Sequence, residues 1–336
     1  MLRRTLLTSA LLTATIVPGT GCWMDSGSGT PLIEAEDVRM EPPGTMGFRQ
    51  LGDKGEVYGL ALDVSDDVNH WVTDIAVGMS KLVHELDQHP ATREEGDWRV
   101  YGPQDDEDGR DGAWMVKITG DSAAASFEVY IGRRGASEEQ MRLLISGDVS
   151  VVESERDGRF TIDFDTIREL EDLIDGVNAD ADYGGKITVS FERNADTLYK
   201  RVELDFDGFY ADDGEDDLDF DGESYLYHRE DDGAGRFHFA TWSSFEGEWS
   251  GPALERMTVD MRWDADEAGR AQGSVVEVDG VGDLRHGDLT VAECFDGNGG
   301  LTWRSLDEPY LGYEPDYAFG DEKTCVFGES DMIARE

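Results

Sequence analysis

Lysine and cysteine are scarce in this chain, and its charge balance excludes one class of function. The 336 residues include six lysines and 23 arginines against 75 acidic residues, a formal net charge of −46 at pH 7. A surface this acidic repels nucleic acid and anionic headgroups, so we expect no nucleic-acid partner. The acidic residues are spread along the whole chain, which we interpret as adaptation to a salty medium, with cation binding as the alternative.

Motifs of the common enzyme classes are also missing. No serine lies in a Gly-x-Ser-x-Gly turn, and no Gly-x4-Gly-Lys loop is present to hold a phosphate. His84 and His89 are five residues apart, whereas two zinc ligands on one helix face need a spacing of four. Carboxylates are so numerous that a glycosidase-like pair cannot be singled out. The sequence therefore favours no particular catalytic chemistry.

Long apolar runs are missing except at the N-terminus. The Arg3–Arg4 pair precedes an uncharged run over 5–17, too short to stay in a bilayer, and small residues then lead to Cys22. This order is typical of a lipoprotein signal, although Gly19 stands where the pattern prefers leucine. We expect 1–21 to be a cleaved signal peptide and Cys22 to carry the lipid. Loss of the two arginines would take the net charge from −46 to −48.

The predicted anchor sets the compartment and the domain organisation. A lipidated Cys22 would place the chain in the cell envelope, on a periplasmic or extracellular face, with the membrane as a partner. The Arg3–Arg4 pair permits twin-arginine export as well as the general route. We expect a flexible tether over 22–50, rich in Gly, Pro, Ser and acidic residues, and a single β-rich globular domain over 51–336.

If Cys22 carries the lipid, an even pair of cysteines remains. In an exported chain, Cys294 and Cys325 are expected to form a disulfide, and the alternative is two buried thiols. Such a crosslink has a nominal stabilising effect of roughly 3–4 kcal/mol in the chain-entropy model. A metal site would need more ligands nearby, and only His286 is close in sequence.

Apolar residues at helical spacing predict one long helix over about 66–88. Residues 65–67 (Ser-Asp-Asp) provide capping groups and negative charge at its start, and Pro90 follows its end. A shorter helix is expected over about 166–175, and the segment 56–64 is interpreted as a strand. The long helix has an apolar stripe that must pack on a sheet, formed by Val68, Trp71, Val72, Ile75, Met79, Leu82, Val83 and Leu86.

From Trp98 onward, apolar residues alternate with polar ones, which predicts β-strands. Short linkers rich in Gly, Asp or Asn separate the strands, with Asp157–Gly158 expected at one bend and 194–196 at another. The expected strands are 113–119, 125–133, 140–147, 149–153, 159–164, 186–193, 198–206, 223–229, 236–242, 254–263, 273–278, 289–295 and 301–305.

These strands predict a mainly β (β-rich α+β) fold. No βαβ rhythm is present, so we expect a large meander of twelve to fourteen antiparallel strands. A sheet this large should curl into a barrel, a half-barrel or a two-layer sheet, with the two helices packed on it. The charge on the strand 200–207 argues against a barrel that spans a membrane.

Two groups of residues are candidates for binding a metal or a ligand. Asp217, Asp219 and Asp221 lie at alternate positions before a glycine, as in the first half of a calcium loop. His228 stands at position twelve, where that loop needs a bidentate glutamate, so a solvated acidic loop is the alternative. His228 and His238 lie on adjacent expected strands and form the histidine pair to test as ligands or as an acid/base pair.

The chain as a whole resembles a family of uncharacterised predicted lipoproteins from myxobacterial-type Gram-negative bacteria. The residues that carry the likeness are the helix Val68–Leu86 followed by Trp98–Pro103, the segment Gly158–Phe164, and Val291–Asp296 with the later Cys325. After the first late cysteine the family tends to have tryptophan, whereas this chain has phenylalanine. The resemblance implies a surface or periplasm-facing lipoprotein, with no known activity and no catalytic residue to transfer.

The sequence leaves three hypotheses for function. The first is a non-enzymatic, lipid-anchored domain that binds an apolar small ligand or an envelope protein, with the tryptophans in the core or lining a cavity for an apolar or sugar ligand. The second is an extracytoplasmic hydrolase that uses a carboxylate pair. The third is a calcium-binding surface protein that uses 205–223. No cofactor is expected apart from calcium in this third case.

Overall fold

The sheet dominates the molecule. The computed structural model describes residues 33–43, 55–87, 89–105, 111–121, 123–170, 182–212, 217–220, 222–244, 253–277, 282–284, 288–307 and 318–332. In these ranges one antiparallel sheet of sixteen strands runs in chain order from β1 to β16, except that β9 pairs with β8 and β11 beside the main path. The predicted antiparallel meander is confirmed.

The strands have the following bounds: β1 (Arg93–Glu95), β2 (Trp98–Asp105), β3 (Gly112–Gly120), β4 (Ala124–Arg133), β5 (Arg142–Val152), β6 (Glu155–Asp163), β7 (Asp182–Asn194), β8 (Lys200–Asp212), β9 (Asp217–Asp219), β10 (Ser224–Arg229), β11 (Gly235–Ser244), β12 (Leu254–Trp263), β13 (Gly269–Val276), β14 (Leu289–Phe295), β15 (Leu301–Asp307) and β16 (Phe319–Gly320). The helices are α1 (Ala35–Val38), α2 (Glu56–Asp87), α3 (Phe164–Glu169) and α4 (Glu329–Met332), with short 3₁₀ turns at Glu138–Gln140 (η1) and Glu322–Thr324 (η3).

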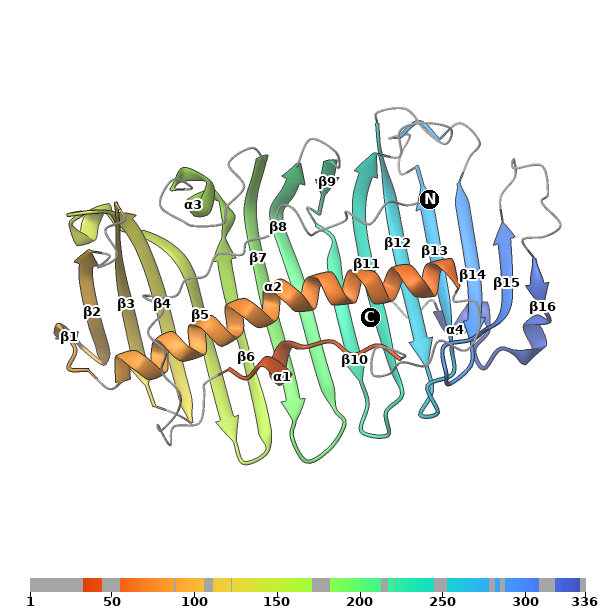
Figure 1. Cartoon of the computed structure of the whole chain (residues 1–336), viewed down its shortest axis with the longest axis horizontal. Coiled ribbons are helices and arrows are strands. Elements are labelled where there is room, and N and C mark those ends of the chain that lie inside the picture. The colour runs from red at the N-terminus through yellow and green to blue at the C-terminus, as the bar shows by residue number, and fades with distance from the viewer. Residues whose placement is uncertain are drawn as a thin grey trace.

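The sheet is open. β1 and β16 lie at opposite ends of the strand order, and Figure 1 shows the strands side by side across the width of the molecule. Closure into a barrel, one of the expected outcomes, is therefore wrong. Both edge strands are very short, and β1 consists of charged Arg-Glu-Glu, which limits pairing with another chain.

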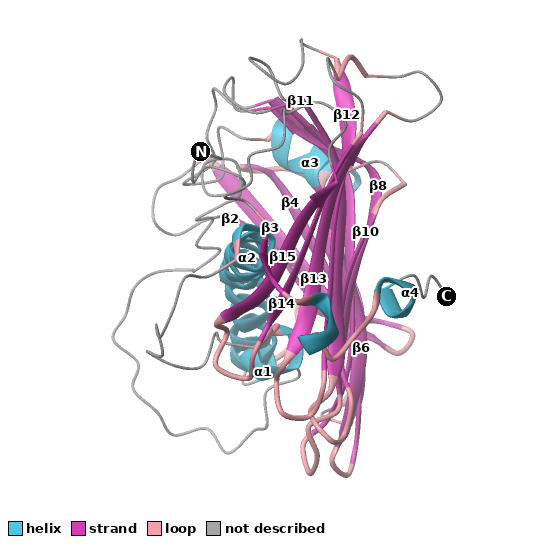
Figure 2. Cartoon of the chain, turned by 90° about the vertical axis from the view of Figure 1, so that its right-hand side faces the viewer, coloured by secondary structure: helices cyan, strands magenta, loops and turns pink. Residues whose placement is uncertain are grey.

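Helix α2 crosses the strands on one face of the sheet (Figure 1). Its 32 residues make a rod of about 48 Å, and neighbouring strands lie about 4.8 Å apart, so α2 covers about ten strand spacings. If the sheet closed into a barrel, its outer strands could no longer contact this straight helix. We call the face under α2 the inner face and the opposite face the outer face. Figure 2, seen along the edge of the sheet, shows α1 and α2 on one side and α4 on the other.

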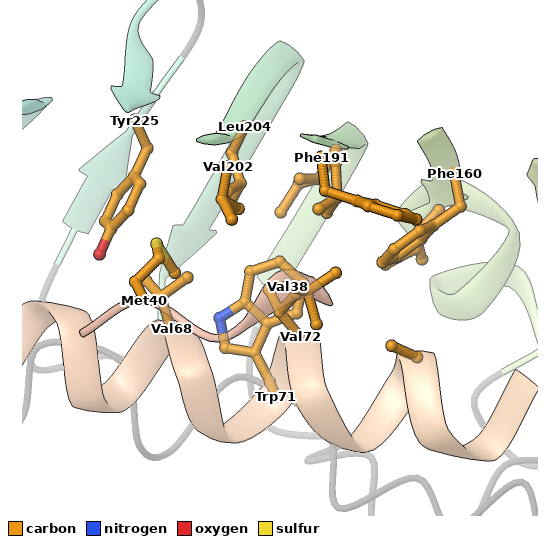
Figure 3. Packing of buried hydrophobic residues seen from close by; sticks show 14 of the residues in the cluster. Val38, Met40, Val68, Trp71, Val72, Phe160, Phe191, Val202, Leu204 and Tyr225 are labelled. Carbon is orange, nitrogen blue, oxygen red and sulfur yellow. The ribbon is translucent and has the colours of Figure 1, made fainter. Parts of the chain in front are cut away.

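Alternation along the strands separates the two faces. In β7, Ile187, Val189 and Phe191 are buried on the inner face, whereas Ser190 and Glu192 point outward and are half-exposed or exposed. One hydrophobic core lies between the inner face and α2. Figure 3 shows part of it, with side chains of α2 and of the segment 38–40 facing those of the strands; the labelled residues are Val38, Met40, Val68, Trp71, Val72, Phe160, Phe191, Val202, Leu204 and Tyr225.

The long helix begins ten residues earlier than predicted, at Glu56, and the expected strand over 56–64 is wrong. Val57, Tyr58 and Ala61 are buried and continue the apolar stripe in helical spacing, so the pattern admits a helix here as well as a strand. The start of the helix depends on a residue distant in sequence, because the carboxylate of Glu293 on β14 caps the first turn. The end at Asp87 agrees with the prediction.

Residues 33–43, expected to belong to a flexible tether, pack against the sheet. We call this segment, which contains α1, the N-terminal strap. Ile33, Val38 and Met40 are buried in the main core. The side chain of Asn69 on α2 holds the strap, since its Oδ1 accepts from the Met40 amide and its Nδ2 donates to the Met40 carbonyl, both at 2.6 Å.

The structure also tests the predicted second helix and one predicted bend. The second helix runs over Phe164–Glu169, with Asp163 accepting a capping bond from the Thr166 amide, and residues 171–175 of the expected helix lie outside the described part. The bend predicted at Asp157–Gly158 is wrong. β5 turns into β6 through Glu153, which has φ of 57°, and Gly158 lies within β6, where the Phe191 ring occupies the space that a side chain would need.

Candidate functional site

The outer face of the sheet carries the candidate site. α1, α2 and the apolar core lie on the inner face (Figure 2), whereas outward side chains of the central strands, such as Ser190, Glu192 and Arg201, are half-exposed or exposed. A hollow of about 410 Å³ lies there over β5–β8. It is lined by Asp148, Asp157, Gly158, Arg159, Ser190, Phe191, Glu192, Arg201 and Glu203.

Both arginines of this hollow are paired with acids that also line it. Arg159 Nε lies 3.0 Å from Asp148 Oδ1, and Arg201 lies 2.8 Å from a Glu203 oxygen on its own strand. Tyr199 donates its hydroxyl to Glu192 at 2.8 Å, and burial and this carboxylate raise the pKa of the tyrosine to about 12. The hollow therefore offers carboxylates, guanidinium groups and a serine hydroxyl as donors and acceptors to a polar ligand.

A row of cations continues from the hollow across five strands. The register places Arg201 of β8 opposite His228 of β10, His228 opposite Arg236 of β11, Arg236 opposite Arg262 of β12, and Arg262 opposite Arg270 of β13. We call these five residues the outer cation row. Like charges directly opposite one another destabilise a sheet, so the opposed arginines Arg236, Arg262 and Arg270 need compensating interactions.

The C-terminal segment covers one half of this row. Residues 318–332, here the C-terminal arm, are joined to β14 by the disulfide Cys294–Cys325, as predicted. Glu322 lies 3.0 Å from Arg270, and Arg262 donates to the Asp331 carbonyl at 2.9 Å. The guanidinium of Arg262 stacks on Phe327 and that of Arg270 on Trp303, each 4.9 Å from the ring centre.

The other half of the row is partly exposed and only locally paired. His228 lies 3.6 Å from Glu230, and burial, with Arg236 and Arg201 adding to it, lowers the histidine pKa against the opposing effect of Glu230. The Nε of Arg236 is buried with no hydrogen-bond partner, and no ion pair joins this side chain to any residue that the structure describes.

The two histidines of the candidate pair are not directly opposite each other. His228 is opposite Arg236, whereas His238 is opposite Leu226, so the two rings lie at different register positions. Each has its own acid, and His238 Nδ1 lies 2.7 Å from Asp260. The two rings are diagonal neighbours on the outer face, and a shared ligand or acid/base role stays a hypothesis.

The calcium candidates are only partly within the described residues. Asp217 and Asp219 are the ends of β9, and Asp221 lies outside the described part, as does Cys22. Among the residues that the structure describes, no group of three or more His, Cys, Asp or Glu is arranged to hold a metal ion. Calcium binding by 205–223 stays a prediction.

The described carboxylates with a raised pKa do not gather in one cleft. Burial raises the pKa of Asp67, Asp205 and Glu293, with help from neighbouring carboxylates at Asp67 and Asp205. These three acids lie on α2, on the outer face of β8 and on the inner face of β14. They do not form the close pair that the hydrolase hypothesis needs.

Sequence reasoning missed both the outer cation row and the hollow. A signal was present, since the short loop at 230–234 pairs His228 with Arg236 once its hairpin register is written out. The continuation to Arg262 and Arg270 needs the register of two more hairpins.

Comparisons with known proteins add no assignment: no protein-family model, curated protein or solved structure matches this chain. Of the helices described, none has both the length and the apolar composition that crossing a membrane requires.

Proposed function

We propose that this chain is an exported lipoprotein, anchored through Cys22, that binds an envelope partner with the outer face of its sheet and catalyses no reaction. The observation that supports this most strongly is the contrast between the faces. The inner face is covered by α2 and the N-terminal strap, with an apolar core and buried ion pairs beneath them, whereas the outer face presents a charged hollow and the outer cation row.

Binding of an apolar ligand beneath α2 is less well supported. Trp71 and Val72 of the helix stripe are 3% and 0% exposed, and Val202 and Leu204 of β8 are fully buried in the same core. A ligand at this position would have to separate the helix from the sheet and expose this apolar surface, at a cost of about 25 cal/mol per Å².

The proposed anchor fits the position of the N-terminal strap. Between Cys22 and Ile33 there are ten residues, which span at most about 35 Å when extended. The strap is held on the inner face, so the anchored chain would keep its outer face clear of the tether.

Photocrosslinking in cells tests this proposal. A photoreactive amino acid at Ser190 in the hollow is expected to give one adduct of defined mass in the membrane fraction, and the same group at Val152, exposed at the β5–β6 turn, is expected to give none. In the variant Cys22→Ser, the chain should leave the membrane fraction and the adduct should be lost. Equal crosslinking from Ser190 and Val152, or an unchanged membrane fraction for Cys22→Ser, would contradict the proposal.

A further inference from the structure

The C-terminal arm shows what kind of group the outer cation row holds. On Arg270 it places a carboxylate, Glu322, and on Arg262 it places an aromatic ring, Phe327, and a backbone carbonyl. The arm is thus an acidic peptide with an aromatic residue, lying on two of the five cations. The disulfide keeps it at this half of the row.

The remaining half has the same chemistry without such a cover. Arg201, His228 and Arg236 continue the row on β8, β10 and β11 at strand spacings of about 4.8 Å. Arg201 and His228 have acidic neighbours on their own strands, Glu203 and Glu230. Arg236 stands between His228 and Arg262 and, within the described residues, has no ion-pair partner and a buried Nε without an acceptor.

Arg236 is costly in an isolated sheet, because it combines like-charge repulsion from Arg262 on the neighbouring strand with a buried Nε donor that has no acceptor. An anion that reaches Arg236 would reduce the charge repulsion and supply an acceptor for its Nε. The rings of Tyr199 and His228, with centres 5.7 Å apart, provide a surface next to it on which an aromatic side chain can pack.

We propose that the open half of the outer cation row binds an extended acidic segment of a partner protein, with a carboxylate on Arg236 and an aromatic residue against Tyr199 and His228. This rests on the proposed function, since it names the partner chemistry for the same outer face. The intramolecular arm favours a peptide over a sulfated glycan, because it already joins a carboxylate, a ring and a main-chain carbonyl to two cations of this row.

Fluorescence anisotropy on the purified chain tests the inference. The probe is a fluorescein-labelled hexapeptide of alternating glutamate and phenylalanine, with a lysine–phenylalanine hexapeptide as the charge control and a heparin hexasaccharide as the glycan competitor. The acidic probe should bind, weaken as salt is raised and be displaced by its unlabelled form, whereas the lysine peptide should not bind.

Variants locate the site. Arg236→Ala should lower the affinity for the acidic probe by about tenfold or more. Arg142 is an exposed arginine at the start of β5, and Arg142→Ala should change this affinity by no more than about twofold. Glu322→Gln should strengthen binding severalfold, because it loosens the arm from Arg270. Because Arg142 and Glu322 are more than half exposed, these two variants should keep the fold.

Equal affinity of Arg236→Ala and the unchanged chain, or heparin binding in the absence of acidic-peptide binding, would overturn the inference. The proposed function has its own readout, the Ser190 adduct. Absence of peptide binding together with a retained adduct would remove the acidic-segment assignment alone, and loss of both would remove the outer face as a binding surface.

Discussion

Glu293 determines at the residue scale where α2 begins. Its carboxylate, fully buried on the inner face of β14, accepts from the amides of Glu56, Val57 and Tyr58 at 2.8, 2.9 and 3.1 Å. These are orphan donors of the first helical turn, and the negative charge also complements the helix dipole. Gly55 leaves room for the carboxylate, since a Cβ there would lie 2.1 Å from a Glu293 oxygen.

Replacing this carboxylate should cost stability. Glu293→Gln keeps the shape but turns an amide donor toward backbone N–H groups, and we expect a loss of about 1–3 kcal/mol in the free energy of unfolding. Urea unfolding measures it, with Glu94→Gln on exposed β1 as the control. A loss no larger than that of the control would show that the cap does not hold the helix.

The same substitution should change the dependence of stability on pH. Burial raises the pKa of Glu293 above its ordinary 4.5, more than its three amide donors and Arg304 lower it. The folded state therefore binds the proton more tightly than the unfolded state, and this group's contribution to stability falls as pH rises from about 4.5 through the raised pKa. In Glu293→Gln, this contribution should be absent from the pH profile.

At the element scale, the N-terminal strap is held by a second, inner row of cations. Arg156, Arg193, Lys200 and Arg229 lie opposite one another on β6, β7, β8 and β10. Asp37 of α1, fully buried, lies 2.9 Å from Arg156 and 3.1 Å from Arg193. Thus an acidic terminal segment covers a basic row on each face of the sheet.

Breaking the strap's buried ion pair should be far more costly than breaking an exposed one. Asp37→Asn leaves Arg156, itself 5% exposed, without its closest carboxylate, and we expect a loss of about 3–5 kcal/mol in the free energy of unfolding. Glu36→Gln, in an exposed pair with Arg39 on the same segment, should cost about 0–1 kcal/mol. Similar values for both variants in urea unfolding would contradict packing of the strap in the core.

Element boundaries show what sequence can and cannot predict. The hairpins β7–β8, β10–β11 and β14–β15 were predictable because alternation and turn residues are local signals. The start of α2 was not, because its cap is 237 residues from Glu56. The strap was misjudged as tether for a similar reason: its counter-charges Arg156 and Arg193 are distant in sequence and become neighbours only through the sheet register.

At the scale of the whole molecule, the fold is an open sheet with one face packed against the hydrophobic core. Fifteen strands in the main path span about 67 Å at about 4.8 Å per interval, wider than the rod of α2 that covers them. The outer cation row is notable in a chain of net charge −46, because it gathers five basic groups on the face that the core leaves accessible. This asymmetry is the basis of the proposed binding face.

Cysteine accessibility tests that claim most directly. Leu226, partly exposed on the outer face between Glu203 and His238, is replaced by cysteine, and its reaction rate with a membrane-impermeant maleimide is compared between the purified chain and the same chain in envelopes opened to the reagent. We predict rapid labelling of the purified chain and strong protection in the envelope, relieved by excess acidic peptide. Equal labelling in both settings would contradict a partner bound on the outer face.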